Sequence, residues 1–177
     1  HQDAPTNICW GDMNRSTLVR VPLGWQRATD MCQLANPLED TCLRDRSMKQ
    51  TFEMRSPDGS AEIYTLMAGL AVACRHGLEM RDALVVAKHT YVDVNIHNNE
   101  HADRLRTLKQ LPDSCAASAQ CLVGQRAIYE QYGVFSPQMI DGIVRELKAY
   151  NDVTLRHDVT GNLSAMQQLV ERYFHCG

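Results

Sequence analysis

The sequence lacks the features that mark a membrane protein, a zinc ribbon or a nucleic-acid-binding domain. It contains no apolar run long enough to span a bilayer, and its N-terminal residues show no signal-peptide pattern. No two cysteines form a C-x-x-C pair, which argues against a zinc ribbon or a thioredoxin-type redox motif. The formal net charge of −3 provides no strong basic field, so we expect neither a nucleic-acid nor a membrane partner.

The composition is that of a globular protein with a hydrophobic core. The 177 residues are 44% hydrophobic and 22% charged, which is ordinary for one domain. The seven cysteines stand at long spacings: Cys9, Cys32, Cys42, Cys74, Cys115, Cys121 and Cys176. Because their number is odd, we expect reduced thiols and a cytoplasmic location. The chain begins at His1, which is compatible with a processed protein or a fragment.

Hydrophobic patterning predicts an α+β fold, with a few antiparallel strands in the first third and a helix-rich C-terminal half. Residues 8–11 and 16–21 alternate like two strands joined by a polar turn, which predicts a hairpin, and residues 51–56 predict a third strand. The expected organisation is therefore a strand-and-loop segment over residues 1–56 and a helical segment over residues 57–177.

Apolar residues at helical spacing predict the helices of the second segment. The first helix follows a turn over residues 57–60, with Asp58 or Ser60 as its cap, and its apolar stripe should be buried. That stripe consists of Ile63, Leu66, Met67, Leu70 and Cys74. Further helices are predicted at about 81–88, 100–110, 114–132, 137–150 and 164–174. Residues 91–96 alternate like a strand, and an extended loop is the alternative.

Charged residues stand on the predicted strands, where core residues are expected. Glu53 and Arg55 are two residues apart, so they share one face of a strand. Arg15 and Arg20 are five apart, so Arg15 must reach the same site from the turn, or a bulge must intervene. Guanidinium groups suit phosphate and carboxylate oxygens, and a carboxylate suits Mg²⁺ or Mn²⁺. The pattern indicates a polar site for anions and a metal, although solvated surface charges would give the same pattern.

Three segments of the chain resemble consecutive blocks of the glutamine synthetase family, in its bacterial and archaeal type. They are APTNICWG at 4–11 with NRS at 14–16 and RVP at 20–22, then EMRSPDGSA at 53–61, and more weakly LPDS at 111–114. The order and spacing of the first two blocks make the resemblance specific, and it spans most of the chain. It implies that residues 1–177 are a C-terminal part of the family's catalytic domain.

The resemblance implies an ATP-dependent glutamate–ammonia ligase that acts through γ-glutamyl phosphate, with ATP and Mg²⁺ or Mn²⁺ as cofactors. Matched residue by residue, Arg15 and Arg20 would contact the ATP phosphates, and Arg15 and Arg55 would be catalytic. Glu53 would bind the metal, and Arg55 would bind glutamate. Family members are longer, form homo-oligomers and carry further metal ligands upstream, so we expect this chain to be inactive alone.

Two departures from the family pattern leave alternatives open. Glu62-Ile63 stands where the family usually has Asn-Pro, and Thr51 stands where a basic residue is frequent. These departures allow a catalytically inert domain kept for structure or regulation. A related γ-glutamyl ligase that uses another amine also stays open, because the amine-binding residues lie largely upstream in the family. Tyr91 lies near the position of a tyrosine that some bacterial members modify, but its surroundings do not match that motif.

Overall fold

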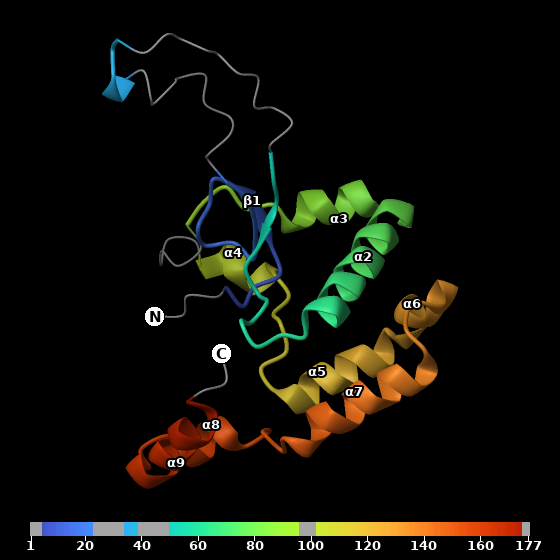
Figure 1. Ribbon diagram of the computed structural model, residues 1–177. Helices are drawn as coiled ribbons and strands as arrows, with labels where there is room; N and C mark the ends of the chain where they lie inside the picture. Colours follow the sequence, from blue (N-terminus) through green and yellow to red (C-terminus); the bar gives the residue numbers. More distant parts are fainter. Residues whose placement is uncertain (1–4, 23–33, 39–49, 96–101, 175–177) are drawn as a thin grey trace. The chain divides into compact units, whose positions relative to one another are not determined.

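The computed structural model describes residues 5–22, 34–38, 50–95 and 102–174, and within it the chain divides into two compact units (Figure 1). None of the helices in these ranges is long and apolar enough to cross a membrane.

The two units do not follow the chain order. The first comprises His1–Ser56 and Leu84–Gln110, and the second comprises Pro57–Ala83 and Leu111–Gly177. One boundary falls between residues 56 and 57, where the sequence predicts the change from strands to helices. Residues 84–110 belong with the strands, so helical residues also contribute to the unit that carries the sheet.

A three-stranded sheet lies in the first unit. Its strands β1 (Trp10–Asp12), β2 (Val19–Val21) and β3 (Glu53–Met54) are ordered β1-β2-β3. β1 and β2 run parallel, whereas β2 and β3 run antiparallel with Arg20 directly opposite Glu53. The small early sheet followed by many helices confirms the predicted α+β class.

The hairpin predicted for the first two strands is wrong, because β1 and β2 pair in parallel. A hairpin needs a tight turn that reverses the chain. Here Met13 adopts a left-handed φ of 54°, and its N–H donates to Val21 O at 2.9 Å. The Asn14 side chain also ties the connection to the carbonyls of Val92 and Val94. The Met13 contact joins the ends of the two strands, and the Val19 N–H donates to Cys9 O at 3.1 Å where both strands begin, so β2 runs in the same direction as β1.

The segment after helix α3 (Ala83–Thr90) lies against β1. The Val92 N–H donates to Trp10 O at 2.8 Å, and Tyr91 forms an isolated parallel bridge with Trp10. Apart from this bridge, residues 92–95 form no strand, so the extended loop is the alternative that the structure supports. A Cβ at Gly11 would lie 2.4 Å from Val92 O, so glycine is required for this approach. Residue 96 lies outside the described residues.

A small hydrophobic cluster stabilises the first unit. It is formed by the buried side chains of Cys9, Val92 and Leu108, with Val94 packed against it. Helix α4 (Ala102–Thr107) lies within the range predicted for residues 100–110. Arg104 of α4 donates through Nη2 to the carbonyls of His89 and Tyr91, both at 2.7 Å, and so fixes the segment next to β1.

The second unit is helical. Its elements are α2 (Ile63–Glu79), α5 (Cys115–Gly124), α6 (Arg126–Glu130), the 3-10 helix η4 (Gln131–Gly133), α7 (Pro137–Ala149), α8 (Leu155–Val159) and α9 (Leu163–Tyr173). Helices α5 and α7 lie side by side (Figure 1). The buried residues Val72, Phe135 and Ile140 form the core of this unit.

Capping residues explain where several helices begin. Ser136 accepts from the Met139 N–H at the start of α7, and Asn162 accepts from the Ala165 N–H at the start of α9. The cap of α2 is Glu62, which accepts from the N–H groups of Tyr64 and Thr65, and the predicted caps Asp58 and Ser60 are wrong. Asp58 instead accepts from the N–H and hydroxyl of Ser60 in the preceding turn.

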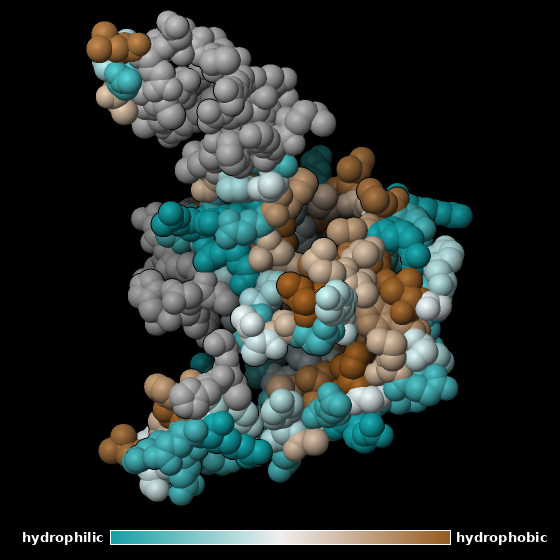
Figure 2. All heavy atoms as spheres, in the orientation of Figure 1, coloured by the Kyte–Doolittle hydropathy of each residue, from teal (hydrophilic) through white to brown (hydrophobic). Residues whose placement is uncertain are grey.

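Other predictions for the helical segment need correction. The helix predicted over residues 114–132 is interrupted at Gln125, whose φ of −107° and ψ of 7° are not helical, and α8 was not predicted. The stripe on α2 is largely exposed, with Ile63 at 63% and Met67 at 60%, because the helix buries Val72 instead. Figure 2 shows hydrophobic side chains at the surface in the region of this helix.

Candidate functional site

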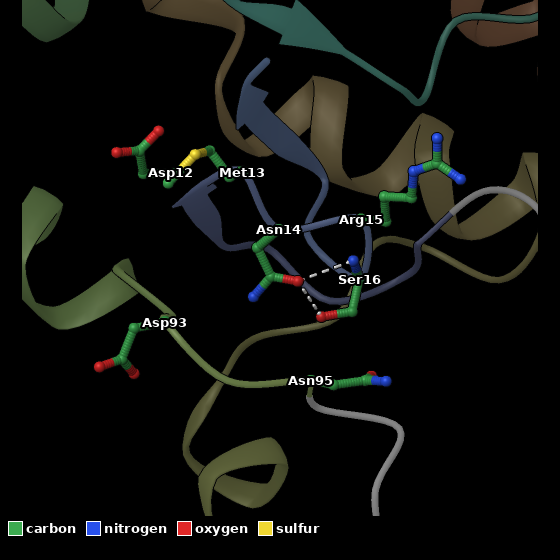
Figure 3. Close-up of a pocket in the computed structure, with 7 residues that line it drawn as sticks. All are labelled: Asp12, Met13, Asn14, Arg15, Ser16, Asp93 and Asn95. Atoms are coloured by element: carbon green, nitrogen blue, oxygen red, sulfur yellow. Dashed lines mark hydrogen bonds between the residues drawn. The ribbon is translucent and has the colours of Figure 1, made fainter. Parts of the chain in front are cut away.

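The turn that carries Arg15 is held by the side chain of Asn14 (Figure 3). Asn14 Nδ2 donates to Val92 O at 3.2 Å and to Val94 O at 2.8 Å. Its Oδ1 accepts from the Ser16 N–H at 2.9 Å and from the Ser16 hydroxyl at 2.7 Å. A carboxamide has two donors and two acceptor sites, so these four contacts use its full capacity. Asn14 therefore fixes the backbone from which Arg15 projects.

The residues that follow Arg15 are buried, although the Arg15 side chain is exposed. Thr17 and Leu18 are 0% and 4% exposed. The Thr17 hydroxyl lies 3.0 Å from both Asn14 O and Val19 O, which satisfies it inside the protein. Arg15 is thus a long, exposed side chain on a turn that hydrogen bonds hold in place. This arrangement suits the binding of an anion from solvent.

Arg20 and Glu53 form an ion pair across β2 and β3. Arg20 Nε donates to Glu53 Oε2 at 2.7 Å, and Arg20 Nη2 lies 2.7 Å from the same oxygen. The side chains are 23% and 41% exposed, so both are partly shielded from water. The sequence pointed to both residues as site candidates, and the structure brings them into direct contact.

Arg55 connects the end of β3 to the Arg15 turn. Its backbone N–H donates to Leu18 O at 3.0 Å, and its Nη1 donates to the carbonyl of Arg15. The four candidate residues therefore lie in one unit and are linked in two pairs: Arg20 with Glu53, and Arg55 with Arg15. Arg15 reaches its position from the turn, which is one of the two geometries that its spacing from Arg20 allowed.

A pocket of about 400 Å³ opens beside this turn. Its lining residues are Asp12, Met13, Asn14, Arg15, Ser16, Asp93 and Asn95. Figure 3 shows Asp12 and Asp93 on one side and Arg15 on the other, so the pocket presents both signs of charge. Arg20, Glu53 and Arg55 do not line it, and Arg15 is its link to the predicted site.

Sequence reasoning missed the structural role of Asn14 and the pocket residues Asp93 and Asn95. Asn14 precedes Arg15 in a polar turn, and asparagine commonly stabilises turns through its side chain. The position of Asn14 in a polar turn was therefore a signal in the sequence. The approach of residues 92–95 to this turn could not be predicted, because about eighty positions of sequence separate the two segments.

One side chain of the candidate site, Glu53, is of a type that binds divalent cations. Glu53 offers a hard carboxylate oxygen, the ligand type that Mg²⁺ and Mn²⁺ prefer. Within the described ranges, no group of three His, Cys, Asp or Glu side chains is placed to hold an ion together. Among the candidate residues, Glu53 thus offers one carboxylate of the type that such a cation prefers.

Comparison with known proteins gives a consistent assignment. The family model described as "glutamine synthetase, catalytic domain" matches residues 1–162. The chain is 26% identical over 175 residues to a glutamine synthetase of Thermococcus kodakarensis, and 24% identical over 174 residues to those of Pyrococcus abyssi and Pyrococcus furiosus. These matches cover 97–98% of this chain but 34% of each relative, so the chain spans about a third of their length. No solved structure matches.

Proposed function

The chain belongs to the glutamine synthetase catalytic-domain family, and from this premise we propose that it is part of an ATP-dependent glutamate–ammonia ligase. The proposed reaction passes through γ-glutamyl phosphate, and the parent protein is a cytoplasmic homo-oligomer that makes glutamine. The observation that carries the proposal is the contact between Arg20 and Glu53, two residues that the family resemblance assigns to phosphate and metal.

Each of the four candidate residues has a role in this proposal. Arg15 and Arg20 bind phosphate groups of ATP, since a guanidinium offers several donors to phosphate oxygens. Glu53 is one ligand of Mg²⁺ or Mn²⁺, which when bound supplies positive charge to the phosphate oxygens. Arg55 binds glutamate and holds the phosphorylated intermediate. The exposure of Arg15 and the half-buried state of Arg20 and Arg55 are compatible with these roles.

The proposed chemistry has two steps. An oxygen of the glutamate γ-carboxylate attacks the γ-phosphorus of ATP, and ADP leaves. Ammonia then attacks the γ-carbonyl carbon, phosphate leaves, and the new amide nitrogen loses a proton. Both steps spread negative charge over oxygens, so positioning and charge neutralisation by the arginines lower the barrier.

The departure at Glu62 is compatible with this function. Glu62 caps α2 by accepting from the Tyr64 and Thr65 N–H groups, at 3.1 and 2.7 Å. Hydrogen bonds lower the pKa of the Glu62 carboxyl, first that with the Thr65 side chain and then those from the Thr65 and Tyr64 N–H groups. Glu62 is therefore the N-cap of α2 and Ile63 its first residue, so the helix starts normally at this departure from the family pattern. The departure gives no reason to expect a loss of turnover.

Transfer of oxygen from glutamate to phosphate tests the proposed reaction. The full-length protein is incubated with ATP, Mg²⁺, ammonia and glutamate labelled with ¹⁸O in its γ-carboxylate. We expect one labelled oxygen in each phosphate released, because the carboxylate oxygen stays on phosphorus when the amine displaces it. Phosphate without label would contradict the acyl-phosphate route. Absence of any turnover would favour the inert domain.

The identity of the amine substrate is tested by measuring phosphate release with different amines. Parallel reactions contain ammonia, methylamine, ethylamine or a longer amine, and the kcat/KM values are compared. We expect ammonia to give the highest kcat/KM. A higher value for a larger amine would identify a related γ-glutamyl ligase instead.

A further inference from the structure

The guanidinium of Arg20 approaches Glu53 with two nitrogens that meet a single oxygen. Nε donates to Oε2 at 2.7 Å, and Nη2 lies 2.7 Å from the same Oε2. In a fork-to-fork pair, each nitrogen would take its own carboxylate oxygen. Here both contacts converge on one oxygen, which orients the carboxylate and leaves Oε1 outside these two contacts.

The backbone fixes this pair in place. Arg20 lies on the middle strand β2 and Glu53 on β3, and the two residues are directly opposite in the antiparallel register. Side chains of directly opposed residues stand on the same face of a sheet, close enough to interact. Glu53 is the more exposed partner, 41% against 23%, so a ligand from solvent can reach its carboxylate.

We propose that Arg20 is a positioning residue for the metal ligand Glu53: it holds Oε2 and so directs Oε1 to Mg²⁺ or Mn²⁺. The inference rests on the proposed function, because it takes Glu53 as a ligand. Carboxylates that bind metals are themselves held by hydrogen bonds, and loss of such a partner weakens metal binding by about 10–100-fold. The guanidinium has five N–H donors, so Arg20 keeps its Nη1 group for phosphate.

Positioning and charge act on metal affinity with opposite signs. A positive charge beside a cation site repels the cation, so removing the Arg20 charge would strengthen metal binding if charge alone mattered. Losing the Nε hydrogen bond and the close Nη2 approach would weaken metal binding if positioning matters. Arg20→Lys separates the effects, because lysine keeps the charge but cannot reproduce the planar Nε and Nη2 approach to one oxygen.

Equilibrium binding of Mn²⁺ to the full-length protein, without nucleotide, tests the inference. Arg106→Lys is the matched control, because Arg106 also pairs with a carboxylate of the first unit, Asp103 at 3.3 Å, but is 80% exposed. We expect the Kd for Mn²⁺ to rise about 10–100-fold in Arg20→Lys. The control should change by less than about twofold, as for exposed pairs. An unchanged or lower Kd in Arg20→Lys would overturn the inference.

A crystal structure of the wild-type protein with Mn²⁺ bound provides a second test that does not depend on the variant folding. We expect Arg20 to remain on Oε2 with Mn²⁺ on Oε1, and an Arg20 side chain displaced from Glu53 would overturn the inference. Failure of these tests in a protein that makes glutamine would leave the proposed function intact. Absence of Mn²⁺ binding to the wild-type protein would overturn the metal site itself.

Discussion

The two units hold their side chains by different means. In the first unit, polar groups bridge segments that are far apart in sequence: Trp10 Nε1 donates to Ala87 O at 2.8 Å, and Asn14 binds Val92 and Val94. In the second unit, helices begin at local caps and pack around a buried apolar cluster. The unit that carries the candidate site therefore adds single hydrogen-bonding side chains to a small apolar cluster, whereas the helical unit has the larger apolar core.

The largest stability effect should come from the core of the helical unit. Ile140 is 0% exposed and packs in the cluster with Val72 and Phe135. Ile140→Ala removes buried methyl groups and leaves a cavity, so we expect a loss of about 2–5 kcal/mol. Native-state hydrogen exchange of the α7 amides measures this loss in the free energy of unfolding. Val153→Ala, at a residue 71% exposed, is the control and should change stability by less than about 0.5 kcal/mol. Equal losses of stability in Ile140→Ala and Val153→Ala would contradict the assignment of Ile140 to the core.

A smaller but site-specific effect is expected in the first unit. Asn14→Ala removes the partners of the Ser16 N–H and of two carbonyls, so we expect a local loss of about 1–3 kcal/mol. Because Asn14 fixes the Arg15 turn, the KM for ATP should also rise. Steady-state kinetics and hydrogen exchange of residues 13–18 measure the two effects. The exposed Gln138→Ala is the control, and an unchanged KM in Asn14→Ala would count against a positioning role for Asn14.

Two glycines should respond to the same substitution with opposite signs. Gly11→Ala would place a Cβ 2.4 Å from the backbone carbonyl of Val92, so we expect destabilisation of about 1–3 kcal/mol. Gly69 lies inside α2 with nothing within 4 Å of its added Cβ, so Gly69→Ala should stabilise by about 0.5–1 kcal/mol. Thermal unfolding of the two variants checks the signs. A neutral Gly11→Ala would show that residues 91–95 do not approach β1 closely.

The smallest effect concerns pH and the start of α5. Asp152 accepts from the Cys115 N–H at 2.6 Å and the Ala116 N–H at 3.2 Å, and these contacts, chiefly the first, lower the pKa of its carboxyl. A lowered pKa in the folded state stabilises the fold above the ordinary value of about 4. This contribution disappears as the pH falls through the lowered pKa.

The expected contribution of Asp152 is about 0.3–1 kcal/mol, as for an anion at a helix N-terminus. Asp152→Asn should therefore reduce the loss of stability between pH 5 and strongly acidic pH by about that amount. Thermal unfolding across this range, with the exposed Asp113→Asn as control, measures it. A pH profile identical to that of the wild-type protein would exclude this role of Asp152.

The same contrast between the units explains what could be predicted from the sequence. Helix α7 was predicted over residues 137–150 and runs over Pro137–Ala149, because Ser136 and Pro137 mark its start and Ile140 and Val144 its buried side. Such signals are local. The break at Gln125 was missed although Gly124, the last residue of α5, is a helix-stop signal directly before it.

Long-range pairing in the first unit could not be predicted. β1 and β2 pair in parallel, and Asn14 in the connection between them contacts the distant residues Val92 and Val94, whereas sequence alternation does not specify the direction of pairing. Likewise, the sequence suggested charged site residues at Arg20 and Glu53 but not their contact across 33 positions. The site residues could be proposed one by one, whereas their arrangement required the fold.

The most direct test of the proposed function is phosphate release from ATP by the full-length protein, measured with and without glutamate and ammonia. Glu53→Ala is compared with Glu79→Ala, a matched control because Glu79 also pairs with an arginine, Arg75 at 3.9 Å, but lies in the helical unit. We predict release that requires both substrates, persists in Glu79→Ala and falls at least about 100-fold in Glu53→Ala, as for loss of a major transition-state contact. Equal rates in the two variants would contradict the assignment of the site.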